Sequence, residues 1–303
     1  MPHARFPAIL FALACVACAG TGAKSGASDE DTPFVAINPE NPPPIGKFLA
    51  ELDLAMRYWT NLTLTASTAE SQREARQLEA HLSLQTSRRI GELIEQLQSG
   101  PPRNRQRAAT ALGFTHDSRA QGPLLAALHD SDANVVHNSL LGLALLAMGD
   151  TPTDRLVELM ADHEDPDTRS QAAYALRSIA AAGGPADDLV GPAQMALLDP
   201  DAGVRSQAAL VLGLAIDGES VQQLGDLLYD EIPLVQHAAI EALLLIGQGD
   251  GRSRGATARA LVDAWVEAKR AMRQRLKMSI VVLAGEDLGE AEEDWIEWSR
   301  RLP

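Results

Sequence analysis

Two segments of the chain have nearly the same sequence. Residues 168–177 read Thr-Arg-Ser-Gln-Ala-Ala-Tyr-Ala-Leu-Arg, and residues 204–213 read Val-Arg-Ser-Gln-Ala-Ala-Leu-Val-Leu-Gly. The pattern recurs more weakly from residues 104, 135, 235 and 272, with small or apolar residues four, seven and eight positions after each start. Successive starts are 31 to 37 residues apart, the length of two helices and a turn. The repeat therefore predicts an array of helix pairs.

The composition supports an all-α fold. Hydrophobic residues make up 46% of the 303 residues, but aromatic residues only 4%, so Ala and Leu carry most of the apolar mass. This balance favours helices that pack closely through small side chains over a β-sandwich. A chain of this length and composition can bury a substantial core.

Each motif helix is expected to be followed by a second helix that ends in an apolar cluster and an acidic residue. The predicted second helices are 120–128, 153–160, 192–198, 221–228 and 258–266. In the two Asp-Pro-Asp turns we expect the first aspartate, Asp165 or Asp199, to cap the next helix while the proline forms its first turn.

The pattern Asp-Pro-Asp-x-x-Val-Arg-x-x-Ala-x-x-x-Leu-Gly of residues 199–213 resembles the HEAT repeat family, in particular the short type shared with phycobilisome-lyase-like proteins. The resemblance covers about residues 100–285. It implies a right-handed α-α superhelix, a HEAT/armadillo-like solenoid whose second helices line a concave surface used for partners. Val136 and Gln236 replace the usual arginine, and the third and fifth repeats carry insertions, so irregular curvature is expected there.

Residues 1–18 have the composition of an export signal, with a basic start, an apolar run and small residues behind it. A cysteine at the end of the run resembles a bacterial lipoprotein signal, in which that cysteine receives a diacylglycerol. We favour Cys18, with Cys15 as the alternative; a plain secretory leader is the other reading. Residues 19–44 are predicted to be a disordered tether. The expected location is the periplasm or a membrane-anchored lipoprotein of a bacterial envelope, with membrane contact only through the lipid.

The two ends of the array are expected to be capped, because an open end would leave an apolar face in water. Residues 45–99 predict an N-terminal helical hairpin, whose second helix opens with a capping box at Ser67-Thr-Ala-Glu70 and runs to Gly100. A partner-binding arm is the alternative for this hairpin. Residues 286–303 are predicted to be a C-terminal capping helix.

One position of the motif predicts a structural arginine ladder. Its members are Arg105, Arg169, Arg205 and Arg273. Because the arginine has the same place in each repeat, we expect it to pair with acids between neighbouring repeats, such as Asp167 and Asp201, and not to bind a ligand.

The sequence predicts no catalytic, metal or cofactor site. No two histidines have the four-residue spacing of a helical metal site. Both cysteines lie in the leader, so the body of the chain has no thiolate for a metal or a disulfide.

The charge of the chain disfavours nucleic acid as a partner. The net charge is −15, and the stretch from His129 to Glu231 holds 18 acidic residues against four arginines. Binding a phosphate backbone requires the opposite excess, because Lys and Arg replace condensed counterions.

The expected function is a non-catalytic envelope scaffold that binds a protein partner through its concave surface. The alternatives are an accessory or ligand-binding subunit of an envelope enzyme system and, third, a lyase-type HEAT enzyme. Tryptophans dominate binding energy where they are exposed, although a core position is favoured for Trp265. The candidate interaction residues are Trp265, Trp295, Trp298, Arg252 and Arg254.

Overall fold

The computed structural model describes residues 43–303, the side chain of Arg270 excepted, and every regular element in that part is a helix. This confirms the all-α prediction. The chain divides into two compact units, unit 1 (Met1–Leu146) and unit 2 (Ala147–Pro303), and each is described by itself. Residues 1–42, which hold the predicted signal, both candidate lipidation cysteines and nearly all of the predicted tether, lie outside the described residues.

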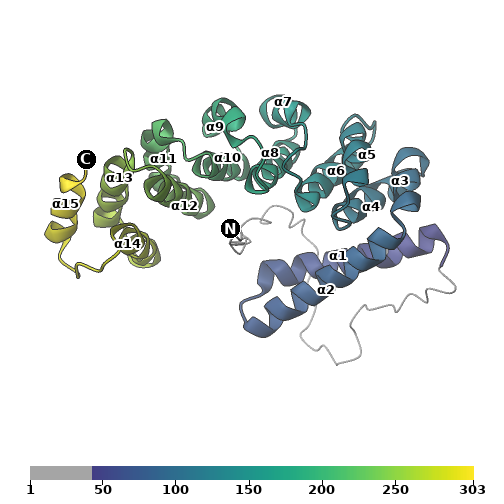
Figure 1. The fold of residues 1–303 in the computed structure, drawn as a ribbon, viewed down its shortest axis with the longest axis horizontal. Helices are drawn as coiled ribbons and strands as arrows, with labels where there is room; N and C mark the ends of the chain where they lie inside the picture. Colours follow the sequence, from purple (N-terminus) through teal and green to yellow (C-terminus); the bar gives the residue numbers. More distant parts are fainter. Residues whose placement is uncertain (1–42) are drawn as a thin grey trace, which may run out of the picture. The chain divides into compact units, whose positions relative to one another are not determined.

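Unit 1 begins with two long helices and continues as packed helix pairs (Figure 1). Helix α1 packs against α2 and α4, α3 packs against α4, and α4 packs against α6. The apolar stripe of α1, which includes Phe48, Leu52 and Trp59, is buried as its spacing predicts. The helices are α1 (Ile45–Thr65), α2 (Ala69–Arg88), α3 (Ile90–Ser99), α4 (Pro102–Gly113), α5 (Gln121–Ala127) and α6 (Ala133–Leu146).

The second helix predicted for the N-terminal hairpin is two helices. Helix α2 ends before Arg89, which has φ −118° and ψ 22°, and α3 starts directly after it. The Arg89 side chain is held by contacts that the local sequence does not reveal. It donates a 3.0 Å hydrogen bond to the Pro43 carbonyl, and its guanidinium lies 4.4 Å from the centroid of the Phe48 ring. These contacts to the start of α1 fix the break.

The cap of α2 also differs from the prediction. The N-cap is Thr68, not Ser67, and its hydroxyl accepts from the Ser71 backbone N–H at 3.1 Å. The Ser71 hydroxyl in turn accepts from the Thr68 N–H at 3.2 Å. Ser71 therefore completes the capping box in place of Glu70, because the whole helix begins one residue later.

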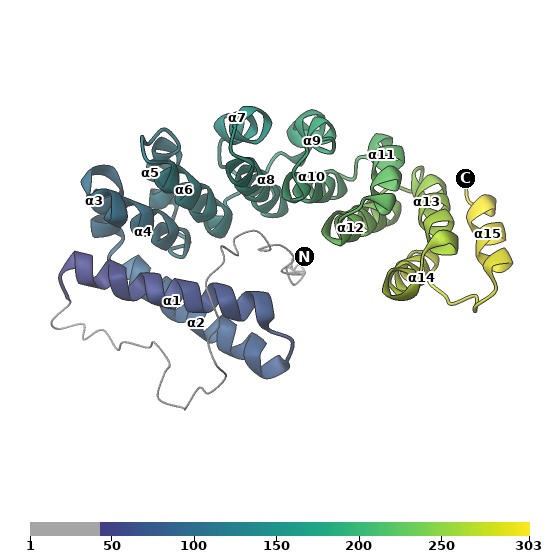
Figure 2. The ribbon, with the colours of Figure 1, turned by 180° about the vertical axis from the view of Figure 1, so that it is seen from behind.

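Unit 2 consists of two layers of helices (Figures 1 and 2). The motif helices α8, α10, α12 and α14 form one layer, and α7, α9, α11 and α13 form the other. Each motif helix packs against the next one along the chain. The helices are α7 (Asp154–Asp162), α8 (Pro166–Ala181), α9 (Val190–Ala196), α10 (Ala202–Leu214), α11 (Val221–Asp226), α12 (Pro233–Gly249), α13 (Arg254–Glu267), α14 (Arg270–Ala284) and α15 (Glu292–Arg301).

The motif helices, and not the second helices, lie on the inner side of the gentle curve of unit 2 in Figure 1. Their small residues explain this. A Cβ added at Gly213 of α10 would lie 2.7 Å from the Cα of Ala242 in α12, so the two backbones nearly touch. Close approach in one layer bends the unit toward that layer. We call α8, α10, α12 and α14 the inner layer and the other row the outer layer.

Among the described residues, no helix has the length and apolar character required to span a membrane.

Candidate functional site

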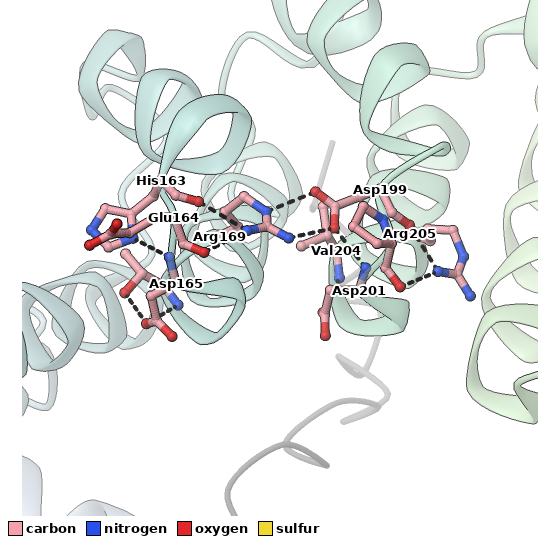
Figure 3. A network of polar contacts seen from close by, with 10 residues as sticks. His163, Glu164, Asp165, Arg169, Asp199, Asp201, Val204 and Arg205 are labelled. Atoms are coloured by element: carbon pink, nitrogen blue, oxygen red, sulfur yellow. Dashed lines mark hydrogen bonds and ion pairs between the residues drawn. The ribbon is translucent and has the colours of Figure 1, made fainter.

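Three of the four ladder arginines bind an aspartate with two parallel hydrogen bonds. Arg169 donates from Nε and Nη2 to the carboxylate of Asp199, both at 2.9 Å (Figure 3). Arg205 binds Asp230 at 2.9 and 3.0 Å in the same way. In unit 1, Arg105 binds Asp130 at 2.8 and 2.9 Å. Bidentate pairs of this kind are strong and directional.

The remaining guanidinium nitrogen binds the turn that precedes the helix. Arg169 Nη1 donates to the carbonyl of His163 at 2.9 Å, and Arg205 Nη1 donates to the carbonyl of Asp199 at 2.8 Å. Asp199 is therefore bound twice, by Arg169 on its carboxylate and by Arg205 on its backbone (Figure 3). At the next repeat, Gln236 keeps only the backbone contact, a 2.6 Å bond to the carbonyl of Asp230.

The ladder exists, but its acids differ from the predicted ones. The partners are the aspartates that close the second helices, not Asp167 or Asp201. Asp201 caps α10 instead, because its carboxylate accepts from the Val204 N–H at 3.1 Å. Asp165 caps α8 as predicted, but Asp199 does not cap α10. The carboxylate of Asp199 is already occupied by Arg169 and by the backbone N–H of Asp201 at 2.7 Å.

Arg273 departs from the pattern, since it binds Glu292 at 2.6 Å and the Trp265 carbonyl at 3.0 Å. The other ladder pairs keep their charges at neutral pH. The hydrogen bonds from Arg105 hold the pKa of Asp130 below its ordinary value. Burial alone would raise the pKa of Asp199, but the bonds from Arg169 and the backbone outweigh it and lower the pKa. These bonds connect successive turns, and they engage the guanidinium groups of Arg105, Arg169 and Arg205 with groups of the chain itself.

Two of the three candidate tryptophans are buried. Trp265 and Trp295 are 1% and 0% exposed and meet edge to face with ring centroids 6.5 Å apart. Lys277 Nζ lies 4.7 Å from the Trp295 ring centroid, and the Arg273 guanidinium lies 4.5 Å from that of Trp265. These rings close the end of the core, so they offer no face to a partner. Trp298, 5.7 Å from Trp295, is half-buried and keeps some accessible surface.

The glycine-rich segment with the candidate arginines is a short turn, because α12 extends to Gly249 and α13 starts at Arg254. The Asp250 carboxylate accepts from the Arg252 backbone N–H at 3.0 Å and from the Ser253 hydroxyl at 2.6 Å. Arg252 is exposed. Arg254 donates to the Leu283 carbonyl at 2.8 Å and thus ties the turn to α14.

The inner layer holds buried polar atoms that have no hydrogen-bond partner, and the sequence reading missed them. They are Nε2 of Gln171, Nε of Arg177 and Oε1 of Gln207. Gln171 and Gln207 lie two residues after their ladder arginines, so they occupy the same position of α8 and α10. Gln207 is only 3% exposed. The Ser-Gln pair repeated in the two best-matched repeats was the signal that could have identified this position.

Arg177 also lies near charged groups of the following inner helices. Its guanidinium is 5.1 Å from the ring centroid of Tyr174. Burial raises the pKa of Glu241 in α12, whereas the charges of Arg177 and Arg275 act to lower it. Groups on α8, α12 and α14 therefore influence one another across the inner layer. We call the surface that contains Gln171, Arg177, Gln207 and Glu241 the inner face.

In the described part of the chain, no three His, Cys, Asp or Glu side chains are placed to hold a metal ion together.

Residues 90–177 match the family of HEAT repeats. This confirms the predicted HEAT resemblance for that segment, which starts at α3 and thus ten residues before the predicted array. A search of curated proteins finds no match.

Several solved structures show similar helical arrangements. A designed armadillo repeat protein is 19% identical, with 63% of this chain and 98% of that chain covered and a TM-score of 0.49. The archaeal HEAT-like repeats protein from Thermococcus onnurineus NA1 is 17% identical over 81% and 98% of the chains, with a TM-score of 0.47. The complex of CpcE and CpcF of phycocyanin lyase from Nostoc sp. PCC7120 is 17% identical over 85% and 100%, with a TM-score of 0.44.

Proposed function

We propose that the chain is a non-catalytic scaffold that binds an extended segment of a protein partner on its inner face. The observation that carries this proposal is the set of unpaired polar atoms on α8 and α10. Leaving a buried donor or acceptor unpaired costs about 1–3 kcal/mol. These two atoms lie beneath the surface, so binding requires the Gln171 and Gln207 side chains to turn outward. The Gln171 amide then offers a donor and the Gln207 amide an acceptor, and a polypeptide backbone supplies both complementary groups at every residue.

The inner face also fits a protein partner in its charge and shape. Arg177 on α8 and Glu241 on α12 provide opposite charges within the inner layer, and Tyr174 provides a half-buried ring. Aromatic rings and arginine are enriched at surfaces that recognise other proteins. The ladder takes no part in binding, because its guanidinium groups are bound to the chain itself.

Partner capture by the purified chain tests this function. We expect Gln171→Ala/Gln207→Ala to lose the partner that the wild-type chain recovers from envelope fractions. The double variant should remain folded, because the removal of unpaired polar atoms offsets part of the cost of the cavity left at Gln207. Gln222→Ala/Gln223→Ala is the matched control, since both of these glutamines are exposed on α11 in the outer layer. Recovery of the same partner by the inner-face variant would show that the partner binds elsewhere.

We further propose that the scaffold is held at a bacterial envelope by a lipid on Cys18. The support is the sequence of residues 1–18, in which an apolar run ends in a cysteine followed by small residues. Palmitate labelling should be present in the wild type, persist in Cys15→Ser and disappear in Cys18→Ser. Globomycin should cause the unprocessed form to accumulate. Absence of label in the wild type would leave the secretory leader as the explanation.

A further inference from the structure

Four large apolar side chains are exposed around two neighbouring turns of unit 2. Met195 and Leu198 are 69% and 83% exposed, and Tyr229 and Ile232 are 54% and 42% exposed. We call these four residues the apolar edge. Large apolar groups gathered at one place on a soluble protein commonly mark an interaction site.

The ladder brings the members of the apolar edge together. Leu198 directly precedes Asp199, and Tyr229 directly precedes Asp230. The guanidinium of Arg205 binds the Asp199 carbonyl at 2.8 Å and the Asp230 carboxylate at 2.9 Å. One side chain therefore joins the two turns that carry Leu198 and Tyr229.

Local geometry adds the other two members. Met195 lies three residues before Leu198, a spacing that places two side chains on the same side of a helical turn. The backbone N–H of Ile232 donates to the Asp230 carboxylate at 2.8 Å, so Ile232 is tied to the same turn as Tyr229. The ladder residue Arg205 therefore holds together the two turns that carry the apolar edge.

Negative charge surrounds the apolar edge. Helix α13 packs against α11, the helix that leads to the turn of Tyr229, and it carries the exposed acids Asp263 and Glu267. Burial raises the pKa of Tyr229, and the carboxylates of Glu267 and Asp263 raise it further. Asp226 and Glu231 flank the same turn and are exposed. The arginine beside these turns, Arg205, is bound in the ladder and is not available to a partner's acids.

We propose that the apolar edge docks a cationic amphipathic segment of a partner protein, with apolar side chains on the edge and Lys or Arg beside the α13 acids. This surface is separate from the inner face and goes beyond the function proposed above. Opposite potentials across such a contact would steer the two partners together.

Charge argues against the other occupants. A second copy docked edge to edge would bring the acids of α13 against their own equivalents, because a two-fold contact pairs the same surface. Two basic residues of the neighbouring helix α14 are already paired, Arg273 with Glu292 and Lys277 with Asp287. An anionic lipid surface would be repelled by the same acids.

The test measures the fluorescence anisotropy of a labelled synthetic helix of Leu and Lys, mixed with the full-length chain. We expect binding that weakens as salt is added, because the charge contacts are exposed. Leu198→Ser/Tyr229→Ser should weaken binding at least tenfold, and Asp263→Asn/Glu267→Gln should weaken it severalfold. Met278→Ser is the matched control, since Met278 is 63% exposed but lies on α14; it should bind as wild type does.

Three results would overturn the proposal. One is equal binding by the Leu198→Ser/Tyr229→Ser variant, whose circular dichroism should match the wild type because both side chains are exposed. Another is equal binding of a peptide in which Glu replaces every Lys. The third is loss of binding in Gln171→Ala/Gln207→Ala, which would place the peptide on the inner face. The two proposals can fail separately. If only the inner-face proposal is wrong, Gln171→Ala/Gln207→Ala still binds the Leu and Lys helix as the wild type does.

Discussion

At each complete ladder position, one guanidinium joins three parts of the chain: its own helix, the turn before it and the turn after the next helix. Arg205 makes these contacts through four nitrogen-to-oxygen distances of 3.0 Å or less, to Asp199, Pro200 and Asp230. Lysine could not do so, because a single ammonium lacks the planar fork. The shorter amide of Gln236 binds only the preceding turn, through the Asp230 carbonyl.

Arg205→Ala should lower the free energy of unfolding by about 1–3 kcal/mol, because it leaves the Asp230 carboxylate and the Asp199 carbonyl without their partner. The fold should persist, since the helices keep their apolar contacts. Chemical denaturation followed by circular dichroism measures the change. Arg155→Ala is the control, because its pair with Glu158 is more exposed and should contribute less than about 1 kcal/mol. Equal effects of the two variants would contradict a special role for the ladder.

The Arg105–Asp130 pair predicts a dependence of stability on pH. The pKa of Asp130 is lowered in the folded state, so its contribution is fully present above the unfolded value of about 3.9 and is lost as pH falls through the folded value. The stability difference between wild type and Arg105→Ala should therefore be constant at neutral pH and shrink below about pH 4. Urea titrations at several pH values measure it. A difference that stays constant to the lowest accessible pH would exclude this linkage.

At the scale of helices, close backbone contacts decide which elements pair. A Cβ added at Gly142 of α6 would lie 2.4 Å from the carbonyl oxygen of Ala109 in α4, and one added at Gly113 would lie 2.6 Å from the Gly142 carbonyl. The sequence predicts most of these helices well, because small residues recur at the packing positions. It does not predict the break at Arg89, because that break depends on contacts to Pro43 and Phe48, which are distant in sequence. It also does not predict the cap at Asp201, because Asp201 takes that place only when the Asp199 carboxylate is bound by the distant Arg169.

Gly142→Ala should destabilise unit 1 by about 1–3 kcal/mol, because the added methyl group forces α4 and α6 apart. Gly91→Ala in α3 is the matched control, since nothing lies within 4 Å of the added Cβ. There we expect a gain of up to about 1 kcal/mol, because alanine restricts the unfolded chain more than glycine. Thermal melts of both variants give the comparison. A neutral Gly142→Ala would mean that the two helices separate at little cost.

At the scale of the molecule, helices pack mainly against near neighbours along the chain, so local damage should remain local. The repeat period revealed this organisation from sequence alone, because small and apolar residues recur at the same packing positions of each repeat. The inner face was harder to foresee. Its glutamines look like ordinary polar residues, and only the three-dimensional structure shows that their amide atoms are buried and unpaired.

A substitution at the C-terminal end of unit 2 tests whether damage to one repeat remains local. Trp295 is fully buried against Trp265 of α13, so Trp295→Ala should cost about 3–5 kcal/mol at that end. Because stability in a stack of repeats is transmitted only through neighbours, hydrogen exchange should accelerate in α13, α14 and α15 while α8 and α10 keep their protection. Trp298→Ala removes a half-buried ring and should change exchange much less. Uniform acceleration through all of unit 2 would show that the unit unfolds as one cooperative body, and the tryptophan cap would then stabilise every repeat in it.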